Sequence, residues 1–145
     1  MNCSYKSAVA VYWYGPDGSM SNCSFVNCSS ESYGSTGSVD WFGDYGNLTN
    51  YEFIANNTNV SGGAIFWNSS NGTLSNSNFT GNKAHVAGAI RFTMNFTVIG
   101  CTFKGNTGEY RNILGNANAT LVLRDCNLET IVKISQMNEE NHNLI

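Results

Sequence analysis

Charged side chains are scarce in this chain of 145 residues. Asp, Glu, Lys and Arg make up 12% of the sequence, about half of the roughly 25% usual in globular domains. Lys and Arg form no cluster, which argues against nucleic acid as a partner. No apolar run approaches the roughly 20 residues of a membrane helix. We therefore expect no membrane insertion within this segment.

Strong helix formers are also few. Asn, Ser, Thr and Gly fill the positions that Lys and Glu usually occupy, and proline occurs once. This composition argues against long helices. Aromatic residues make up 12% of the chain and recur regularly, which argues against disorder. The composition predicts an all-β protein with many turns.

The sequence repeats itself about every 25 residues. The clearest unit is residues 64–79, and matching segments cover residues 10–25, 38–53, 89–103 and 113–128. Each segment ends on an apolar anchor, and these anchors are Phe25, Phe53, Phe79, Phe103 and Leu128. Their spacings of 28, 26, 24 and 25 residues indicate a solenoid, because the blades of the runner-up, a β-propeller, need about 40 residues.

Apolar residues alternate with mixed ones within each unit, as in a strand with one buried face. The aliphatic column holds Val11, Val39, Ile65, Ile90 and Leu114. The aromatic column holds Trp13, Trp41, Trp67 and Phe92. Between them, a mixed column expected to face solvent holds Tyr12, Asp40, Phe66, Arg91 and Gly115. Two or three such strands per unit predict a right-handed parallel β-helix of about five coils of about 25 residues.

Asn and Gly recur where the unit is expected to bend. One column holds Asn22, Asn50 and Asn76, a second holds Asn56, Asn82 and Asn106, and the glycines Gly18, Gly46 and Gly72 align between the first two strands. Asn tolerates the left-handed conformation, and its amide can hydrogen-bond along a stack of amides. We interpret the Asn columns as corners, with a sugar-binding ladder as the alternative, and the glycines as turns.

The repeats cover residues 1–134 and leave a polar non-repeat tail over residues 135–145. Asn2-Cys3-Ser4-Tyr5 is similar to Asn22-Cys23-Ser24-Phe25, so the sequence opens inside a repeat. We expect a fragment of a longer solenoid.

Several of these motifs carry a family resemblance. Gly62-Gly63-Ala64-Ile65, with Phe53-Ile-Ala-Asn56, Phe79-Thr-Gly-Asn82 and Phe103-Lys-Gly-Asn106, resembles the GGAI and FxxN repeats of chlamydial polymorphic outer-membrane proteins. The fuller unit, with a Trp after GGAI and an Asn-Gly-x-Leu turn, resembles adhesin-like surface proteins of methanogenic archaea still more. One coil alone has the full GGAI, and the fifth lacks FxxN.

The resemblance covers roughly residues 2–130 and implies a right-handed β-helix in a large surface protein. Such a protein is non-enzymatic and serves attachment, with a protein or glycan of a host or neighbouring cell as its partner. The expected location is the cell surface or the secreted fraction. The β-helix would be either a stalk or the binding body itself.

The alternative function is a fragment of a β-helical polysaccharide lyase or glycoside hydrolase. These enzymes need paired carboxylates on one exposed face, and Asp40 has no carboxylate on a neighbouring coil. Asp17 and Asp44 fall near the same turn on adjacent coils and are interpreted as turn caps, with a shared cation as the alternative. His85 and His142 have no Cys or carboxylate at zinc-ligand spacing. We expect no catalytic residue, metal site or cofactor.

Cys101 and Cys126 fall in one inward column on adjacent coils. They are either small buried thiols or a disulfide, which their distance allows and an extracellular protein would favour. Cys23 and Cys28 are a weaker pair. N-glycosylation is expected at turn sequons, namely Asn59, Asn71 and Asn95.

Four aromatic residues are predicted to face outward near the first strand: Tyr12, Tyr14, Phe42 and Phe66. They either contact the loop Ser29–Gly37 or form a platform on which sugars or a partner protein stack. This group is the candidate binding site of the sequence.

Overall fold

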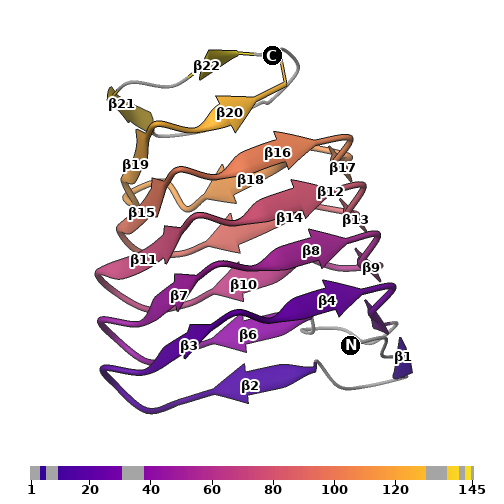
Figure 1. The fold of residues 1–145 in the computed structure, drawn as a ribbon, viewed down its shortest axis with the longest axis horizontal. Coiled ribbons are helices and arrows are strands. Elements are labelled where there is room, and N and C mark those ends of the chain that lie inside the picture. Colours follow the sequence, from indigo (N-terminus) through magenta and orange to yellow (C-terminus); the bar gives the residue numbers. More distant parts are fainter. Residues whose placement is uncertain (1–3, 6–9, 31–37, 130–136, 141–142, 145) are drawn as a thin grey trace.

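The computed structural model describes residues 4–5, 10–30, 38–129, 137–140 and 143–144. These residues form strands and turns, and none of them lies in a helix. Short parallel strands stack on one another into sheets that run along one axis (Figure 1). The predicted parallel β-helix is confirmed, with about four turns roughly 26 residues apart.

The strands form four sheets, here termed sheets A to D. Sheet A consists of β1 (Ser4–Tyr5), β5 (Ser29–Ser30), β9 (Asn57–Thr58), β13 (Lys83–Ala84) and β17 (Thr107–Gly108). Sheet B consists of β2 (Val11–Trp13), β6 (Val39–Trp41), β10 (Ile65–Trp67), β14 (Ala87–Phe92) and β18 (Arg111–Gly115). Sheet C consists of β3 (Ser19–Ser21), β7 (Asn47–Thr49), β11 (Gly72–Ser75), β15 (Phe96–Ile99), β19 (Leu121–Arg124) and β21 (Met137–Glu140). Sheet D consists of β4 (Ser24–Val26), β8 (Glu52–Ile54), β12 (Asn78–Thr80), β16 (Thr102–Lys104), β20 (Asn127–Leu128) and β22 (Asn143–Leu144).

Equivalent residues of successive coils pair directly, which confirms the predicted anchor column. In sheet D, Phe25 pairs with Phe53, which pairs with Phe79 in the next coil. Phe103 follows, and then Leu128. Sheet A adds a short fourth strand to the two or three expected in each coil.

The register of the fifth coil in sheet B differs from the prediction by one residue. The sequence alignment placed Leu114 in the inward column and Gly115 in the mixed column. In the structure Ile113 pairs with Ile90, and Leu114 pairs with Arg91, after a bulge in β14. Ile113 is buried and Leu114 is half-buried. A bulge inserts an unpaired residue, which an alignment by residue type could not reveal.

The predicted tail contains two strands that continue the stack. β21 pairs with β19, with Met137 opposite Leu121, and β22 pairs with β20, with Asn143 opposite Asn127. Both pairings join residues 16 positions apart, so this layer follows a shorter spacing than the repeat.

A ladder of indole rings fills the interior behind sheet B. The rings of Trp13 and Trp41 lie 5.2 Å apart between centroids and 9° from parallel, and Trp41 and Trp67 lie 5.2 Å apart and 10° from parallel. Trp41 and Trp67 are fully buried. The indole N–H of Trp41 donates a hydrogen bond to the carbonyl of Gly43 at 2.8 Å. A second ladder holds Phe53, Phe79 and Phe103, each 4.7 Å from the next.

The aligned glycines are explained by contact with these indole rings. A Cβ atom on Gly46 would lie 2.1 Å from the ring of Trp41, and one on Gly72 would lie 2.2 Å from the ring of Trp67. Neither glycine has a positive φ, so their need is for space and not for an unusual backbone conformation. The sequence predicted the column of glycines as turn residues, but it did not show that the indole rings exclude a Cβ atom there.

Gly72→Ala is expected to lower the free energy of unfolding by about 2 kcal/mol, the typical cost of overpacking a filled core. The ring of Trp67 cannot move aside because it stacks between Trp41 and Phe96. Urea denaturation measures the change. Gly15→Ala is the matched control, because its Cβ would lie 3.7 Å from the nearest ring atom. Equal stability of the two variants would contradict the packing explanation.

Three buried amides form a second kind of ladder, between sheets D and A. The Nδ2 of Asn56 donates to the Oδ1 of Asn82 at 2.9 Å, and the Nδ2 of Asn82 donates to the Oδ1 of Asn106 at 2.8 Å. Asn82 also donates to the carbonyl of Phe53 and accepts from the backbone N–H of Asn56. The predicted amide stack is confirmed. Because these amides are buried, they cannot contact a sugar.

The other Asn column lies on the surface. Asn22, Asn50 and Asn76 have φ angles of 57°, 60° and 50°, which confirms the predicted left-handed corner. The Nδ2 of Asn50 donates to the Oδ1 of Asn22 at 3.2 Å.

Candidate binding surfaces

The four aromatic residues predicted as a binding platform lie together on the outside of sheet B, and we term them the aromatic cluster. The rings of Tyr14 and Phe42 stack at 5.1 Å and 9°, and Tyr12 lies 5.0 Å from Phe42. Phe66 meets the edge of Phe42 at 6.0 Å. Tyr12 and Tyr14 are 59% and 69% exposed, and the two phenylalanines are half-buried. The cluster is therefore one continuous, accessible surface.

The strand register explains how distant residues meet in this cluster. Tyr12 pairs with Asp40, and Asp40 pairs with Phe66 in the next coil. Tyr14 and Phe42 follow the ends of their strands, where the chain still points them outward. The loop Ser29–Gly37, which the sequence offered as an alternative contact, lies largely outside the described residues.

Asp40 corrects one part of the sequence prediction. The mixed column was expected to face solvent, but the side chain of Asp40 is 2% exposed. Its column neighbours are the rings of Tyr12 and Phe66, which flank it on both coils. Desolvation raises the pKa of Tyr12, and Tyr14 and the carboxylate of Asp40 raise it further. The carboxylate of Asp40 is thus enclosed between the aromatic rings of the neighbouring coils.

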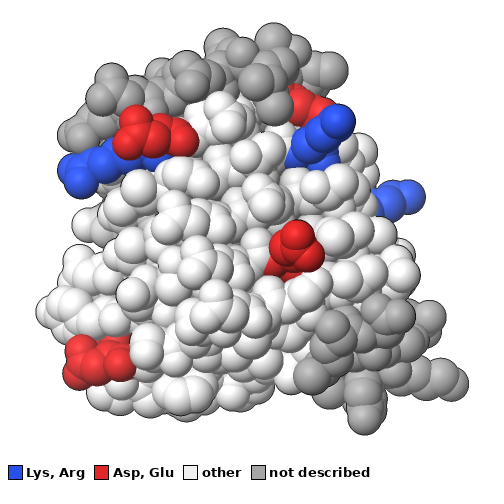
Figure 2. All heavy atoms as spheres, in the orientation of Figure 1, with Lys and Arg blue, Asp and Glu red and all other residues white. Residues whose placement is uncertain are grey.

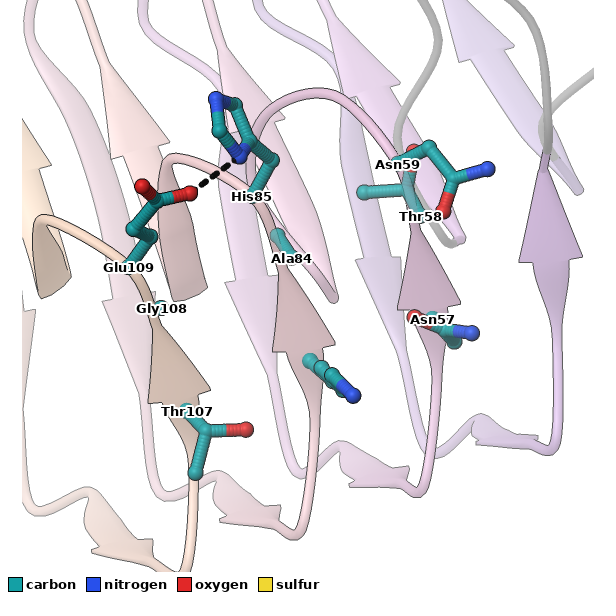
Figure 3. A pocket seen from close by; sticks show the side chains of 9 residues that line it. Asn57, Thr58, Asn59, Ala84, His85, Thr107, Gly108 and Glu109 are labelled. Atoms are coloured by element: carbon teal, nitrogen blue, oxygen red, sulfur yellow. Dashed lines mark ion pairs between the residues drawn. The ribbon is translucent and has the colours of Figure 1, made fainter.

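A polar channel crosses the outside of sheet A, with a volume of about 520 Å³ (Figure 3). One wall consists of Asn57, Lys83 and Thr107, which pair with one another across three coils. The other wall consists of Asn59, His85 and Glu109, and the floor consists of Thr58, Ala84 and Gly108. All six wall side chains are exposed, so the channel is open to a ligand.

An ion pair lies on one wall of the channel. The Nδ1 of His85 lies 2.5 Å from the Oε2 of Glu109 on the next coil, and the two side chains point toward each other in Figure 3. Tyr110 meets the edge of the His85 ring at 5.7 Å. His85 was considered in the sequence only as a zinc ligand, whereas its partner is a carboxylate 24 residues away.

The sequence contained a signal for this channel that the alignment did not use. Asn57, Lys83 and Thr107 each come immediately after the FxxN asparagine. The sequence pattern marks that region as a corner, and a corner carries no expectation of a shared outward face. Only the added strands of sheet A show that they share one face.

Of the two alternatives for Cys101 and Cys126, the structure has the buried free thiols and not the disulfide. Cys23 is also free. Burial raises the pKa of Cys101, and a hydrogen bond with Cys101 lowers the pKa of Cys126 to about 7. Cys28 is disulfide-bonded, and because Cys23 is free, the weaker predicted pair is wrong.

The three predicted glycosylation sites lie on the surface. Asn59, Asn71 and Asn95 are all exposed. The side chain of Asn95 accepts a hydrogen bond from the backbone N–H of Thr120 at 3.0 Å. By contrast, the sequon residue Asn56 is buried in the amide ladder.

Charged groups are few on the face drawn in Figure 2, and in two places an acidic and a basic group lie side by side. Among the described residues, no three His, Cys, Asp or Glu side chains are grouped closely enough to hold a metal ion. In the same ranges, no helix is long and apolar enough to span a membrane. The Oδ1 of Asp44 accepts a hydrogen bond from the backbone N–H of Ser70 at 2.7 Å. Ser70 lies 26 residues away on the next coil, so this bond links two successive turns.

Comparison with known proteins gives no match to a family model, to a curated protein or to a solved structure.

Proposed function

We propose that this β-helix is a non-enzymatic, adhesin-like binding body, and that the aromatic cluster contacts a glycan or protein of another cell. The observation that carries the proposal is the continuous surface of Tyr12, Tyr14, Phe42 and Phe66. Two of its rings are more than half exposed, although apolar side chains gain free energy when they leave water. A contiguous exposed apolar patch marks an interaction site.

The scaffold suits such a surface because it fixes the rings in space. Tyr12 lies on a strand paired in register with its neighbour. Trp13, between the two tyrosines, is stacked on Trp41 inside the solenoid. Rigid aromatic side chains lose little conformational entropy on binding. Aromatic faces bind both sugar rings and apolar protein groups.

The proposed identity is a repeat segment of an adhesin-like surface protein, as the GGAI and FxxN motifs imply. The proposed location is the cell surface or the secreted fraction. The disulfide at Cys28 supports it, since disulfides persist in oxidising environments. N-glycosylation at the exposed residues Asn59, Asn71 and Asn95 forms part of the same proposal.

Tyr14→Ser is expected to weaken binding of the chain to its ligands about tenfold, the loss expected from removing one stacking ring at a binding site. The measurement is binding of the labelled chain to an array of immobilised glycans and to whole cells. Tyr45→Ser is the matched control. Tyr45 is 62% exposed and makes no ring contact with another described residue.

Each outcome separates the alternatives. Equal binding by the two variants, or no binding by the parent chain to any glycan or cell, would contradict the proposal. Incubation of the parent chain with pectin and related polysaccharides tests the enzyme alternative. Release of unsaturated or reducing sugars would replace the adhesin by a lyase or hydrolase.

A further inference from the structure

The channel on sheet A presents a row of hydrogen-bond donors along the solenoid axis. Asn57, Lys83 and Thr107 occupy equivalent positions of β9, β13 and β17, at the strand spacing of about 4.8 Å. Their amide, ammonium and hydroxyl groups all donate, and all three side chains are exposed. Figure 3 shows the side chains of Asn57 and Thr107 pointing to the same side.

The charges of the channel differ between its two walls. On the wall opposite Lys83, the Oε2 of Glu109 lies 2.5 Å from the Nδ1 of His85. Among the described residues, no carboxylate lies within ion-pair distance of Lys83. The ammonium group of Lys83 is therefore the cation of this channel that is open to a ligand. An anionic group flanked by hydrogen-bond acceptors is its chemical complement.

The shape of the channel favours a chain over a small ion. A second hollow of about 290 Å³ continues from it and shares Thr107, Gly108 and Glu109. Tyr110, Asn112 and Glu129 line this hollow. Tyr110 is 54% exposed, and the carboxylate of Glu129 accepts a hydrogen bond from the backbone N–H of Gly105 at 2.7 Å. A ring for stacking and an amide for hydroxyl groups are the contacts that a further sugar residue would use.

From these observations we propose that the channel binds an acidic polysaccharide, with a uronate carboxylate on Lys83 and neighbouring sugar hydroxyls on Asn57 and Thr107. This site is separate from the aromatic cluster and does not depend on it. The channel and the cluster lie on different sheets, so one chain would hold two glycan surfaces. Specificity for acidic chains then comes from one lysine.

The test is titration of the chain with polygalacturonate, followed by calorimetry or biolayer interferometry. Lys83→Gln is expected to weaken binding about tenfold, which is the loss of one charge-assisted hydrogen bond. Lys83→Arg keeps the charge and is expected to retain most of the affinity. Lys104→Gln is the matched control, because Lys104 is exposed on sheet D and does not line the channel.

Further ligands distinguish the source of the anion. Dextran should not bind, free galacturonate should bind far more weakly than the polymer, and sulfated dextran shows whether any anionic chain suffices. The proposal is overturned if polygalacturonate does not bind, if dextran or sulfated dextran binds equally, or if Lys83→Gln and Lys104→Gln behave alike. Tyr14→Ser should leave this binding unchanged, so failure here is distinguishable from failure of the aromatic cluster.

Discussion

Trp41→Asp is expected to leave the chain unfolded in water. Trp41 is fully buried and stacks on Trp13 and on Trp67. Removal of such a side chain costs about 3–5 kcal/mol, and a buried carboxylate without a partner adds several kcal/mol. The sum exceeds the lower part of the 5–15 kcal/mol that typically stabilises a domain. Loss of the near-ultraviolet circular dichroism of the indoles would report the unfolding.

Tyr45→Asp provides the control for this substitution. It introduces the same charge four residues along the chain at a side chain that is 62% exposed. Its effect should stay within about 0.5 kcal/mol. If Trp41→Asp melts at the temperature of the parent chain, the inward assignment of the aromatic column is wrong.

Asn82→Asp is expected to destabilise the chain by about 3–5 kcal/mol at neutral pH, as for a buried charge that no opposite charge compensates. The new side chain keeps the shape of the amide but loses its two N–H donors. Both partners of those donors, the Phe53 carbonyl and the Oδ1 of Asn106, are acceptors. A carboxylate would therefore face oxygen atoms in a site closed to water.

The penalty of Asn82→Asp should depend on pH, with a known sign. Burial and the facing acceptors raise the pKa of the new carboxyl group in the folded state. The folded state then binds more protons than the unfolded state, so the free energy of unfolding falls as pH rises. The penalty should be smallest below about pH 4, the ordinary pKa of Asp, where a protonated carboxyl donates one hydrogen bond again.

Urea denaturation of Asn82→Asp and of the parent over a range of pH measures this difference. Asn59→Asp is the control, because Asn59 is exposed. A pH-independent difference for Asn82→Asp, or an equal one for the control, would contradict the role of the amide ladder.

Periodicity alone predicted the solenoid, because each coil buries the same columns. Trp41 and Phe53 recur in their columns at positions that the register of the sheets confirms. A buried position accepts only large apolar side chains, so the residue type at that position indicates that it faces the core. The four residues of the aromatic cluster were also predicted, since they alternate with buried ones.

The sequence pattern did not show that a smaller side chain in one column is balanced by a larger side chain in the next column. In the fourth coil, Phe92 stands where the third has Trp67, and Phe96 stands where it has Gly72. The smaller ring leaves room that the second phenylalanine fills. An alignment of single columns treats Phe96 as a departure, whereas the pair conserves the volume of the core.

The polar channel was not predicted because its wall residues are exposed, and their common place after the FxxN asparagine does not by itself show that they share one face. Asn57, Lys83 and Thr107 share no residue type, and hydrophobic pattern carries no information about them. Only the path of the backbone shows that the short strands of sheet A align. The residue types at these exposed positions are not set by packing in the core, so a single sequence does not indicate that they belong to one surface.

The direction of the backbone hydrogen bonds has a mechanical consequence. They run between coils, as from the N–H of Thr73 to the carbonyl of Gly46 at 2.9 Å, and therefore lie along the axis of the solenoid. A pulling force along that axis would load the ladders of all four sheets together at each junction.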